Sequence, residues 1–392
     1  MNLALPVRPW GDGGAMLMSV ALKTLIYEWR RFAPAVVAVG FSGLLVLLQA
    51  ALILGIFSLS SVYVTRSAAD IWVGFPGVQS IDLGRPIRSR TELFVRMDPR
   101  VKQVEPFLWG NGEWRTQRQG IVNVFIVGID TRPGAMALAD VLPEDLRLRL
   151  TDPDTVLIDE ADLHKLATGL GGVAEINGRR VRVVGVTSGL RALGGVNIIT
   201  SLSGVRRLDP TAGPGGDVAY YIARLADPDQ ADQVVADLNK VGGHRNFEAL
   251  TADRFADRTT RYWLTESGAG VAFIFGSVVA ILVAVVITSQ TLAAAVAASI
   301  KEYAALRALG FSMQALRTIV LAQSFWVGAA GVAAAGLLTV LLTLGAKALS
   351  APIVLSPPMV LMAGSLVLLV AMGSGFVALR RVAQADPAAL LL

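Results

Sequence analysis

The sequence predicts a membrane protein with four transmembrane α-helices and a large α+β extracytoplasmic domain between the first and second spans. The chain has 392 residues, of which 54% are hydrophobic and only 17% charged, a balance that suits a membrane protein with a sizeable soluble part. Four stretches contain no Asp, Glu, Lys or Arg, and each exceeds the ~20 residues that an α-helix needs to cross a bilayer. They are residues 32–65, 267–300, 318–346 and 348–379.

Residues 1–32 are predicted to form a cytoplasmic leader and an interfacial amphipathic helix. Residues 1–18 have the character of a loose leader, and Met16 and Met18 are alternative starts to Met1. In "SVALKTLIYEWRRFA" the apolar residues share one helical face, which favours a helix lying along the inner leaflet. That face comprises Leu22, Leu25, Ile26, Trp29 and Phe32. An ordinary helix leading into the first span is the alternative.

The first span is predicted at residues 33–62 and is expected to remain in the protein as an anchor. It begins beyond residue 30 and is far longer than the apolar region of a signal peptide. No convincing cleavage site follows it.

Residues 63–265 are predicted to form the external α+β domain. "AEINGRRVRVVGV" places Asn177-Gly178 between alternating apolar positions, which indicates a type I′ hairpin. "GIVNVFIVGI" and "DVAYYIARL" have the pattern of strands, and "DPDQADQVVADLNKVGG" that of a helix. "LTADRFADRTTRYWLTESGAG" predicts a helix that continues into the second span as a rigid stalk.

Two segments of this domain imitate nucleotide-binding motifs. "VLIDEAD" at 156–162 is similar to the acidic magnesium-binding motif of ATPases, and "SLSGVRR" at 201–207 is faintly similar to an ABC signature. However, no G-x-x-x-x-G-K-[ST] motif occurs in the chain, so no phosphate-binding loop is expected. We expect Asp159 instead to cap a helix that runs through Leu163 and Leu166.

We predict no catalytic residues and no metal site. The chain contains no cysteine, and its only histidines are His164 and His244. Neither G-x-S-x-G nor H-E-x-x-H occurs.

The remaining spans are predicted at residues 266–299, 313–347 and 358–379. A short periplasmic loop at 348–357 joins the last two, and residues 380–392 form a cytoplasmic tail.

Basic residues at the ends of the spans predict that both termini are cytoplasmic, since cytoplasmic loops are rich in Lys and Arg. If the cell is Gram-negative, the membrane is the bacterial inner membrane and the external domain is periplasmic. Lys347 is a single exception on the outer side. Between Arg66 and Arg261 the 25 basic and 25 acidic residues cancel, which argues against nucleic-acid binding. The basic residues assigned to the cytoplasm are Lys23, Arg30, Arg31, Lys301, Arg307, Arg317, Arg380 and Arg381.

Residues 300–312 form a charged segment between two apolar spans. On a helical wheel "IKEYAALRALGF" is apolar on several sides, and such a helix at a membrane surface needs a second protein surface to cover it. Gly310 is placed to end this helix in a left-handed cap, and Ser312 to begin the next. The alternative is a helical turn that packs only on its own chain.

"KEYAALRALGFS" resembles the cytoplasmic loop of the FtsX-like/MacB-type ABC transporter permeases, and its Lys-Glu-Tyr version is closest to the DevC branch. The resemblance extends to "VLIDEADLHKL…INGRRVRVVGV" in the external domain and to the "RRVAQADPAALLL" tail. It therefore covers nearly the whole chain.

The resemblance implies that residues 300–312 form a coupling helix seated in a groove of a separate ABC ATPase subunit. ATP and Mg are then used by that partner, and this chain binds no cofactor. The implied assembly is a homodimer or a pair of permeases on an ATPase dimer, with a periplasmic adaptor and a TolC-like outer-membrane duct. The implied ATPase contacts are Lys301, Glu302, Tyr303, Leu306, Arg307, Leu309, Gly310 and Phe311.

The implied function is the export of an amphiphilic substrate, driven by movements of the periplasmic domain. Lipid, glycolipid, lipoprotein and peptide all remain open as substrates. One alternative is a non-transporting FtsX-like regulator of a cell-envelope enzyme. Another is a membrane receptor or scaffold without an ATPase, which the charged loop disfavours.

Overall fold

The structure is a computed structural model that describes residues 23–116, 120–191, 193, 195–243, 245–308, 311–348 and 355–383. It divides into two compact units. One comprises Met1–Gly55 and Ala272–Leu392, and the other comprises Ile56–Val271. We call them the membrane unit and the external unit.

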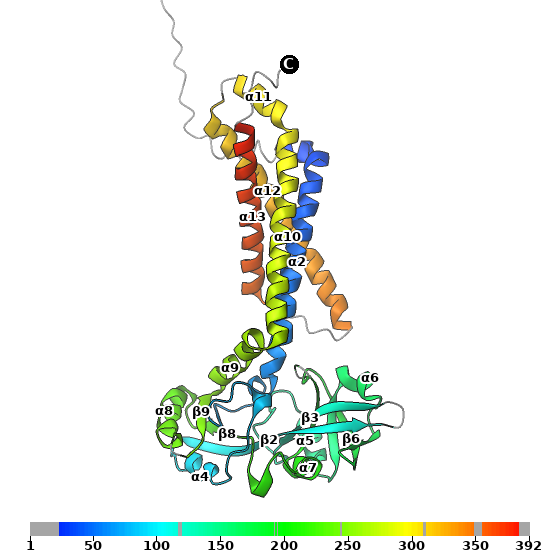
Figure 1. Ribbon diagram of the computed structural model, residues 1–392, viewed down its shortest axis with the longest axis vertical. Coiled ribbons are helices and arrows are strands. Elements are labelled where there is room, and N and C mark those ends of the chain that lie inside the picture. Colours follow the sequence, from blue (N-terminus) through cyan, green and yellow to red (C-terminus); the bar gives the residue numbers. More distant parts are fainter. Residues whose placement is uncertain are drawn as a thin grey trace, which may run out of the picture. The chain divides into compact units, whose positions relative to one another are not determined.

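Four helices of the described chain are long and apolar enough to cross a membrane. The first begins as α2 (Trp29–Ser58) and continues through η1 (Leu59–Ser61) into α3 (Val62–Thr65). The others are α10 (Gly268–Ala298), α12 (Met313–Ala348) and α13 (Pro357–Ala383), shown in Figure 1. The predicted fold class, four spans with a large α+β domain between the first and the second, is confirmed.

The membrane unit is held together by close packing of small and branched side chains. Its apolar cluster draws on α2, α10, α12 and α13, and includes Val39, Leu292, Val327 and Val367. At Gly331 a Cβ atom would lie 2.6 Å from Val39 Cγ1, so the backbone of α12 approaches α2 closely. Such small-residue contacts drive helix association in lipid, where burial against apolar tails supplies no hydrophobic gain.

Part of the external unit has a ferredoxin-like arrangement. In sequence order it comprises β1 (Ile71–Gly74), α4 (Thr91–Arg96), β2 (Val101–Arg115), β8 (Tyr220–Leu225), α8 (Ala231–Gly242) and β9 (Glu248–Thr251). The strands pair antiparallel in the order β9-β1-β8-β2. This is the topology of a split β-α-β unit, and everything between β2 and β8 is inserted into it.

The insertion closes a six-stranded barrel with the second half of β2. The pairings run from β2 to β3 (Ile121–Ile129), β7 (Val196–Ser201), β4 (Thr155–Asp159), β6 (Arg179–Thr187), β5 (Val173–Ile176) and back to β2. Figure 1 shows β2 running from the four-stranded sheet into the barrel. Closure leaves these strands no free edge for pairing with another chain.

Short helices complete the external unit. They are α5 (Glu144–Arg149), α6 (Leu163–Leu166), α7 (Leu202–Leu208), α9 (Ala252–Thr265), and the 3₁₀ helices η2 (Ile81–Leu83), η3 (Glu160–Asp162), η4 (Pro214–Gly216) and η5 (Pro228–Gln230).

The local signals read from the sequence are confirmed. Asn177 and Gly178 have φ values of 49° and 80°, the pair of positive angles that a type I′ turn requires between β5 and β6. Asp159 accepts a hydrogen bond from the Ala161 N–H at 3.1 Å, which caps η3 ahead of α6. The segment "VLIDEAD" is therefore part of the barrel strand β4 followed by the short helix η3.

The predicted continuous stalk is wrong, because the helix is interrupted between α9 and α10. The N–H groups of Glu266 and Ser267 both donate to the Tyr262 carbonyl, at 2.9 and 3.1 Å, and end α9. The Ser267 hydroxyl then accepts from the Gly270 N–H at 2.9 Å, as an N-cap does. The helical periodicity continues on both sides of this interruption, so it did not indicate a boundary. The sequence signal for a new helix was the cap residue Ser267 with Gly268 and Gly270.

Gly270→Ala is expected to destabilise this turn by about 1–3 kcal/mol, the usual cost of forcing an extra methyl group into a packed site. A Cβ atom at Gly270 would lie 2.2 Å from the carbonyl oxygens of Trp263 and Leu264, and backbone atoms cannot move aside cheaply. Gly268→Ala is the matched control, because nothing lies within 4 Å of its Cβ position. Thermal unfolding of the full chain checks this, and equal midpoints for the two variants would contradict it.

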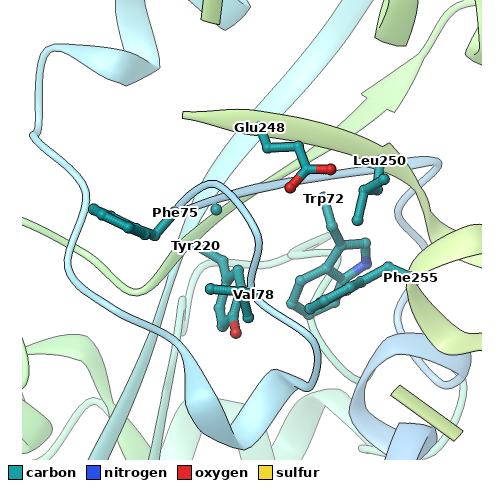
Figure 2. Close-up of a pocket in the computed structure, with 8 residues that line it drawn as sticks. Trp72, Phe75, Val78, Tyr220, Glu248, Leu250 and Phe255 are labelled. Atoms are coloured by element: carbon teal, nitrogen blue, oxygen red, sulfur yellow. The ribbon is translucent and has the colours of Figure 1, made fainter. Parts of the chain in front are cut away.

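An aromatic cluster in the core of the external unit includes residues of α3, which follows the first span, and of α9, which precedes the second. It comprises Tyr63 on α3, Trp72 on β1, Phe107 on β2, Tyr220 on β8 and Phe255 on α9. The ring centroid of Trp72 lies 5.2 Å from that of Phe107, 5.7 Å from Tyr220 and 5.8 Å from Phe255. Figure 2 shows Trp72, Tyr220 and Phe255 around a small hollow, with Glu248 at its rim.

Candidate functional site

The segment singled out by the sequence forms its own helix, α11 (Ile300–Ala308), between α10 and α12. Ser299 separates α10 from α11 and is buried. The N–H groups of Glu302 and Tyr303 both donate to its carbonyl at 3.1 Å. The Ser299 carbonyl thus accepts the first hydrogen bonds of α11, which starts as a helix separate from α10.

An ionic network ties the start of α11 to the start of α2. The Arg31 guanidinium donates to Glu302 at 2.5 Å, to Glu28 at 2.7 Å and to the Ser299 hydroxyl at 3.3 Å. The side chains of Arg31 and Glu302 are 34% and 41% exposed, so solvent screens the pair and its net contribution is about 0–1 kcal/mol. The pair mainly fixes the orientation of α11 relative to α2, because Arg31 contacts Glu28, Ser299 and Glu302 together.

A buried hydrogen bond ties the middle of α11 to α12. The Tyr303 hydroxyl donates to Gln323 Oε1 at 2.8 Å, and the side chains of both residues are almost fully buried. Burial raises the pKa of Tyr303 to about 12, so the phenol keeps its proton at neutral pH and remains a donor. Tyr303 lies in an apolar cluster with Val296 and Leu316, against which Leu306 packs.

The structure therefore divides the predicted contact residues. Tyr303 and Leu306 pack on their own chain, and Glu302 pairs with Arg31. Lys301 is exposed, and Phe311 is 38% exposed beyond the end of α11. Leu309, Gly310 and the side chain of Arg307 lie outside the described residues.

The helix that follows begins where the sequence indicated. The Ser312 hydroxyl accepts a hydrogen bond from the Ala315 N–H at 3.2 Å, as an N-cap does at the start of α12.

The residues predicted for an interfacial helix also fall into two groups. Residues 23–27 are helical and lead through a turn at Glu28 into α2. Ile26 and Trp29 are 65% and 59% exposed. Phe32 is buried in the cluster of the membrane unit and Leu25 packs against it, whereas Leu22 lies outside the described residues.

Sequence reasoning missed two partners of α11. In the sequence analysis Arg31 serves only to orient the membrane spans, and Gln323 is not assigned a role there. The available signal was chemical complementarity, since the Arg31 guanidinium can pair with the Glu302 carboxylate and the Gln323 amide with the Tyr303 phenol.

Two buried charged side chains of the external unit, Glu105 and Arg147, hold backbone groups in place. The Glu105 carboxylate accepts from the Met136 N–H, at 2.8 Å to its nearer oxygen, and burial raises the pKa of Glu105. The Arg147 guanidinium donates to the carbonyls of Asp130 and Ala137 at 2.9 and 2.5 Å. Both residues thus fix the loop that follows β3. Within the described ranges no group of three or more His, Cys, Asp or Glu residues could hold a metal ion.

Two family models match this chain. The model described as FtsX-like permease C-terminal matches residues 274–387, which include α11 and the last two spans. The model described as MacB-like periplasmic core domain matches residues 35–241, more than half of the chain. No curated protein sequence matches significantly.

Two solved structures are similar to part of this chain. The periplasmic region of MacB from Actinobacillus actinomycetemcomitans is 16% identical with a TM-score of 0.34, and the match covers 50% of this chain and 94% of that one. The extracellular domain of the noncanonic ABC-type transporter YknZ from Gram-positive bacteria is 14% identical with a TM-score of 0.31, covering 46% and 99%.

The two family matches together span both units, and the order of their parts is the order found here: a first span, a periplasmic-type domain, and a C-terminal part with α11 between two spans. Assignment to the DevC branch stays a prediction of the loop sequence. The chain belongs to the FtsX-like permeases that carry a MacB-like periplasmic core domain, the multi-pass inner-membrane components of bacterial ABC transporters.

Proposed function

We propose that this permease couples ATP hydrolysis by a separate ATPase subunit to movements of its external unit, which drive export of an amphiphilic substrate. The observation that carries the proposal is α11, a short charged helix that is anchored to α2 by Arg31–Glu302 and to α12 by Tyr303–Gln323. Lys301 is exposed on this helix, and Phe311 is exposed just beyond its end. A helix held in this way transmits a push from a partner to two spans together.

Members of this family work with an ABC ATPase, and here Lys301 and Phe311 are proposed as contacts with it. This chain is proposed to bind no cofactor, with ATP and Mg used by the ATPase. A paired or homodimeric permease, a periplasmic adaptor and a TolC-like duct complete the proposed assembly.

The composition of the spans supports a mechanical mechanism over a polar channel. The four charge-free stretches give an ion or polar solute no charged path through the bilayer. Two of the amides in the spans are engaged: Gln49 donates to the Phe273 carbonyl at 3.4 Å, and Gln323 accepts from Tyr303. These contacts join helix to helix, which agrees with movement of the external unit as the working step.

The proposed orientation places α11 and both termini in the cytoplasm and the external unit in the periplasm, and cysteine labelling tests it. The chain has no native cysteine, and both Ser203 and Ala305 are exposed. In cells with a permeabilised outer membrane, Ser203→Cys is expected to react with a membrane-impermeant maleimide. Ala305→Cys is expected to react only after lysis. Labelling of Ala305→Cys in intact cells would reverse the orientation and remove the ATPase from reach of α11.

A further inference from the structure

A charged groove lies along α9 in the external unit, just ahead of the second span. It has a volume of about 600 Å³, within the range of ligand pockets in proteins. The residues that matter here are Arg254, Asp257, Arg258, Arg261, Tyr262 and Glu266. We call it the α9 groove.

The charges of the α9 groove are only partly neutralised by their neighbours. Arg258 forms two hydrogen bonds with Glu248, at 2.9 and 3.2 Å, and Arg254 pairs with Asp232 at 3.0 Å. Among the described residues, Arg261, Asp257 and Glu266 form no ion pair, and all three are exposed. The groove thus offers one free guanidinium flanked by two free carboxylates.

The α9 groove lies on the helix that immediately precedes the second span in the chain. Residues 261–265 are helical and Gly268 begins α10, so the Arg261 Cα lies within about 17 Å of the first residue of the span. Tyr262 lines the same groove, and tyrosine is enriched at the level of lipid headgroups. We therefore expect the Arg261 side chain to be within reach of a lipid headgroup.

We infer that the α9 groove binds the zwitterionic headgroup of a phosphatidylethanolamine-type phospholipid. The phosphate pairs with Arg261, whose planar guanidinium suits bidentate contact with phosphate oxygens. The ammonium group pairs with Asp257 and Glu266. This deepens the proposed function and rests on it for the side of the membrane, which makes the ligand a lipid of the outer leaflet.

The apolar tails of such a lipid stay outside the protein. The aromatic hollow in Figure 2 adjoins the groove at Glu248, but its free space is about 10 Å³, enough for about one water molecule. Glu248 is also occupied, since it accepts from the Gly77 N–H at 2.8 Å as well as from Arg258. The α9 groove therefore holds a headgroup while the acyl chains remain in the bilayer beside α10.

The test is binding of short-chain lipids to the purified full-length permease, measured by isothermal titration calorimetry without any ATPase. Dihexanoyl phosphatidylethanolamine is expected to bind at least tenfold more tightly than inorganic phosphate or dihexanoyl phosphatidylglycerol. Arg261→Gln is expected to weaken that binding at least tenfold. Asp257→Asn is expected to remove the preference for ethanolamine over glycerol. Arg180→Gln, the same charge change at an exposed barrel position, is expected to bind as wild type does.

Equal binding by wild type and Arg261→Gln would overturn the inference. Inorganic phosphate binding as tightly as the lipid would also overturn it, because the groove would then be a simple anion site. Arg261→Lys, which keeps the charge, is expected to retain part of the affinity and controls for damage to α9. The experiment is independent of the ATPase, so a negative result leaves the coupling proposal standing. Failure of ATPase association likewise leaves this result interpretable.

Discussion

Phe311→Asp is expected to abolish co-purification of the permease with its ATPase subunit while the permease still folds and inserts. Phe311 is 38% exposed and follows α11, so it is available to a partner. Apolar and aromatic side chains at the centre of an interface carry most of its binding energy. An aspartate buried there without a partner costs several kcal/mol, and about 3 kcal/mol already lowers affinity about a hundredfold.

Met97→Asp is the matched control for this experiment. Met97 is 77% exposed at the end of α4 in the external unit, and the change introduces the same charge at an apolar side chain. It is expected to leave the complex intact, and Lys301→Ala to weaken it only slightly, because charges at the rim of an interface contribute little. If Phe311→Asp co-purified with the ATPase at the wild-type level, the coupling role of this segment would fail.

Leu306 is a poorer site for the same test. It packs on the cluster around Tyr303 in its own chain, so an aspartate there would disturb the permease as well as any partner contact. The exposed position of Phe311 separates the two effects.

The sequence was informative wherever one residue or one local pattern decides the structure. Charge-free stretches of sufficient length specify the four spans, since every polar group in the bilayer core must be satisfied internally. Asn177-Gly178 specifies its turn because both residues tolerate positive φ. Asp159 and Ser312 specify helix starts through a single side-chain oxygen.

The topology of the external unit could not be predicted in the same way. β2 pairs with β8, so that Val101 lies opposite Leu225. Within the barrel, β3, the first strand of the insertion, pairs with β7, the last. Such pairings depend on surfaces far apart in the sequence, whereas periodicity reports only which face of one strand is buried. The same limit applies to α11. Its helical wheel shows apolar residues on several sides, but it does not show which of them pack on the chain itself. Tertiary contacts decide that Tyr303 packs against α12 and that Phe311 remains exposed.

The aromatic cluster of the external unit joins α3 to α9. α3 continues from the first span and α9 precedes the second. Ring contacts lead from Tyr63 on α3 through Phe107 and Trp72 to Phe255 on α9, with centroid distances of 6.4, 5.2 and 5.8 Å. Movement of either span is therefore expected to act on the sheet through this cluster, at whose centre lies Trp72.

Trp72→Ala is expected to lower the local free energy of unfolding around β1 and α9 by about 3–5 kcal/mol, the usual cost of removing a buried tryptophan side chain. Trp72 is 1% exposed, so the substitution leaves a cavity among rings that cannot collapse onto it. Trp72→Phe is expected to cost less than Trp72→Ala, because the phenyl ring fills part of the space and leaves a smaller cavity. Trp72 Nε1 has no hydrogen-bond partner within the described part of the chain, so the phenyl ring forfeits packing but no polar contact. Hydrogen exchange of the full chain, followed on peptides from β1 and α9, measures both effects.

Because the α11 surface is untouched, Trp72→Ala is expected to keep the ATPase complex and lose export, whereas Phe311→Asp is expected to lose the complex itself. Equal protection of the two Trp72 variants would show that the cluster does not hold α9 to the sheet.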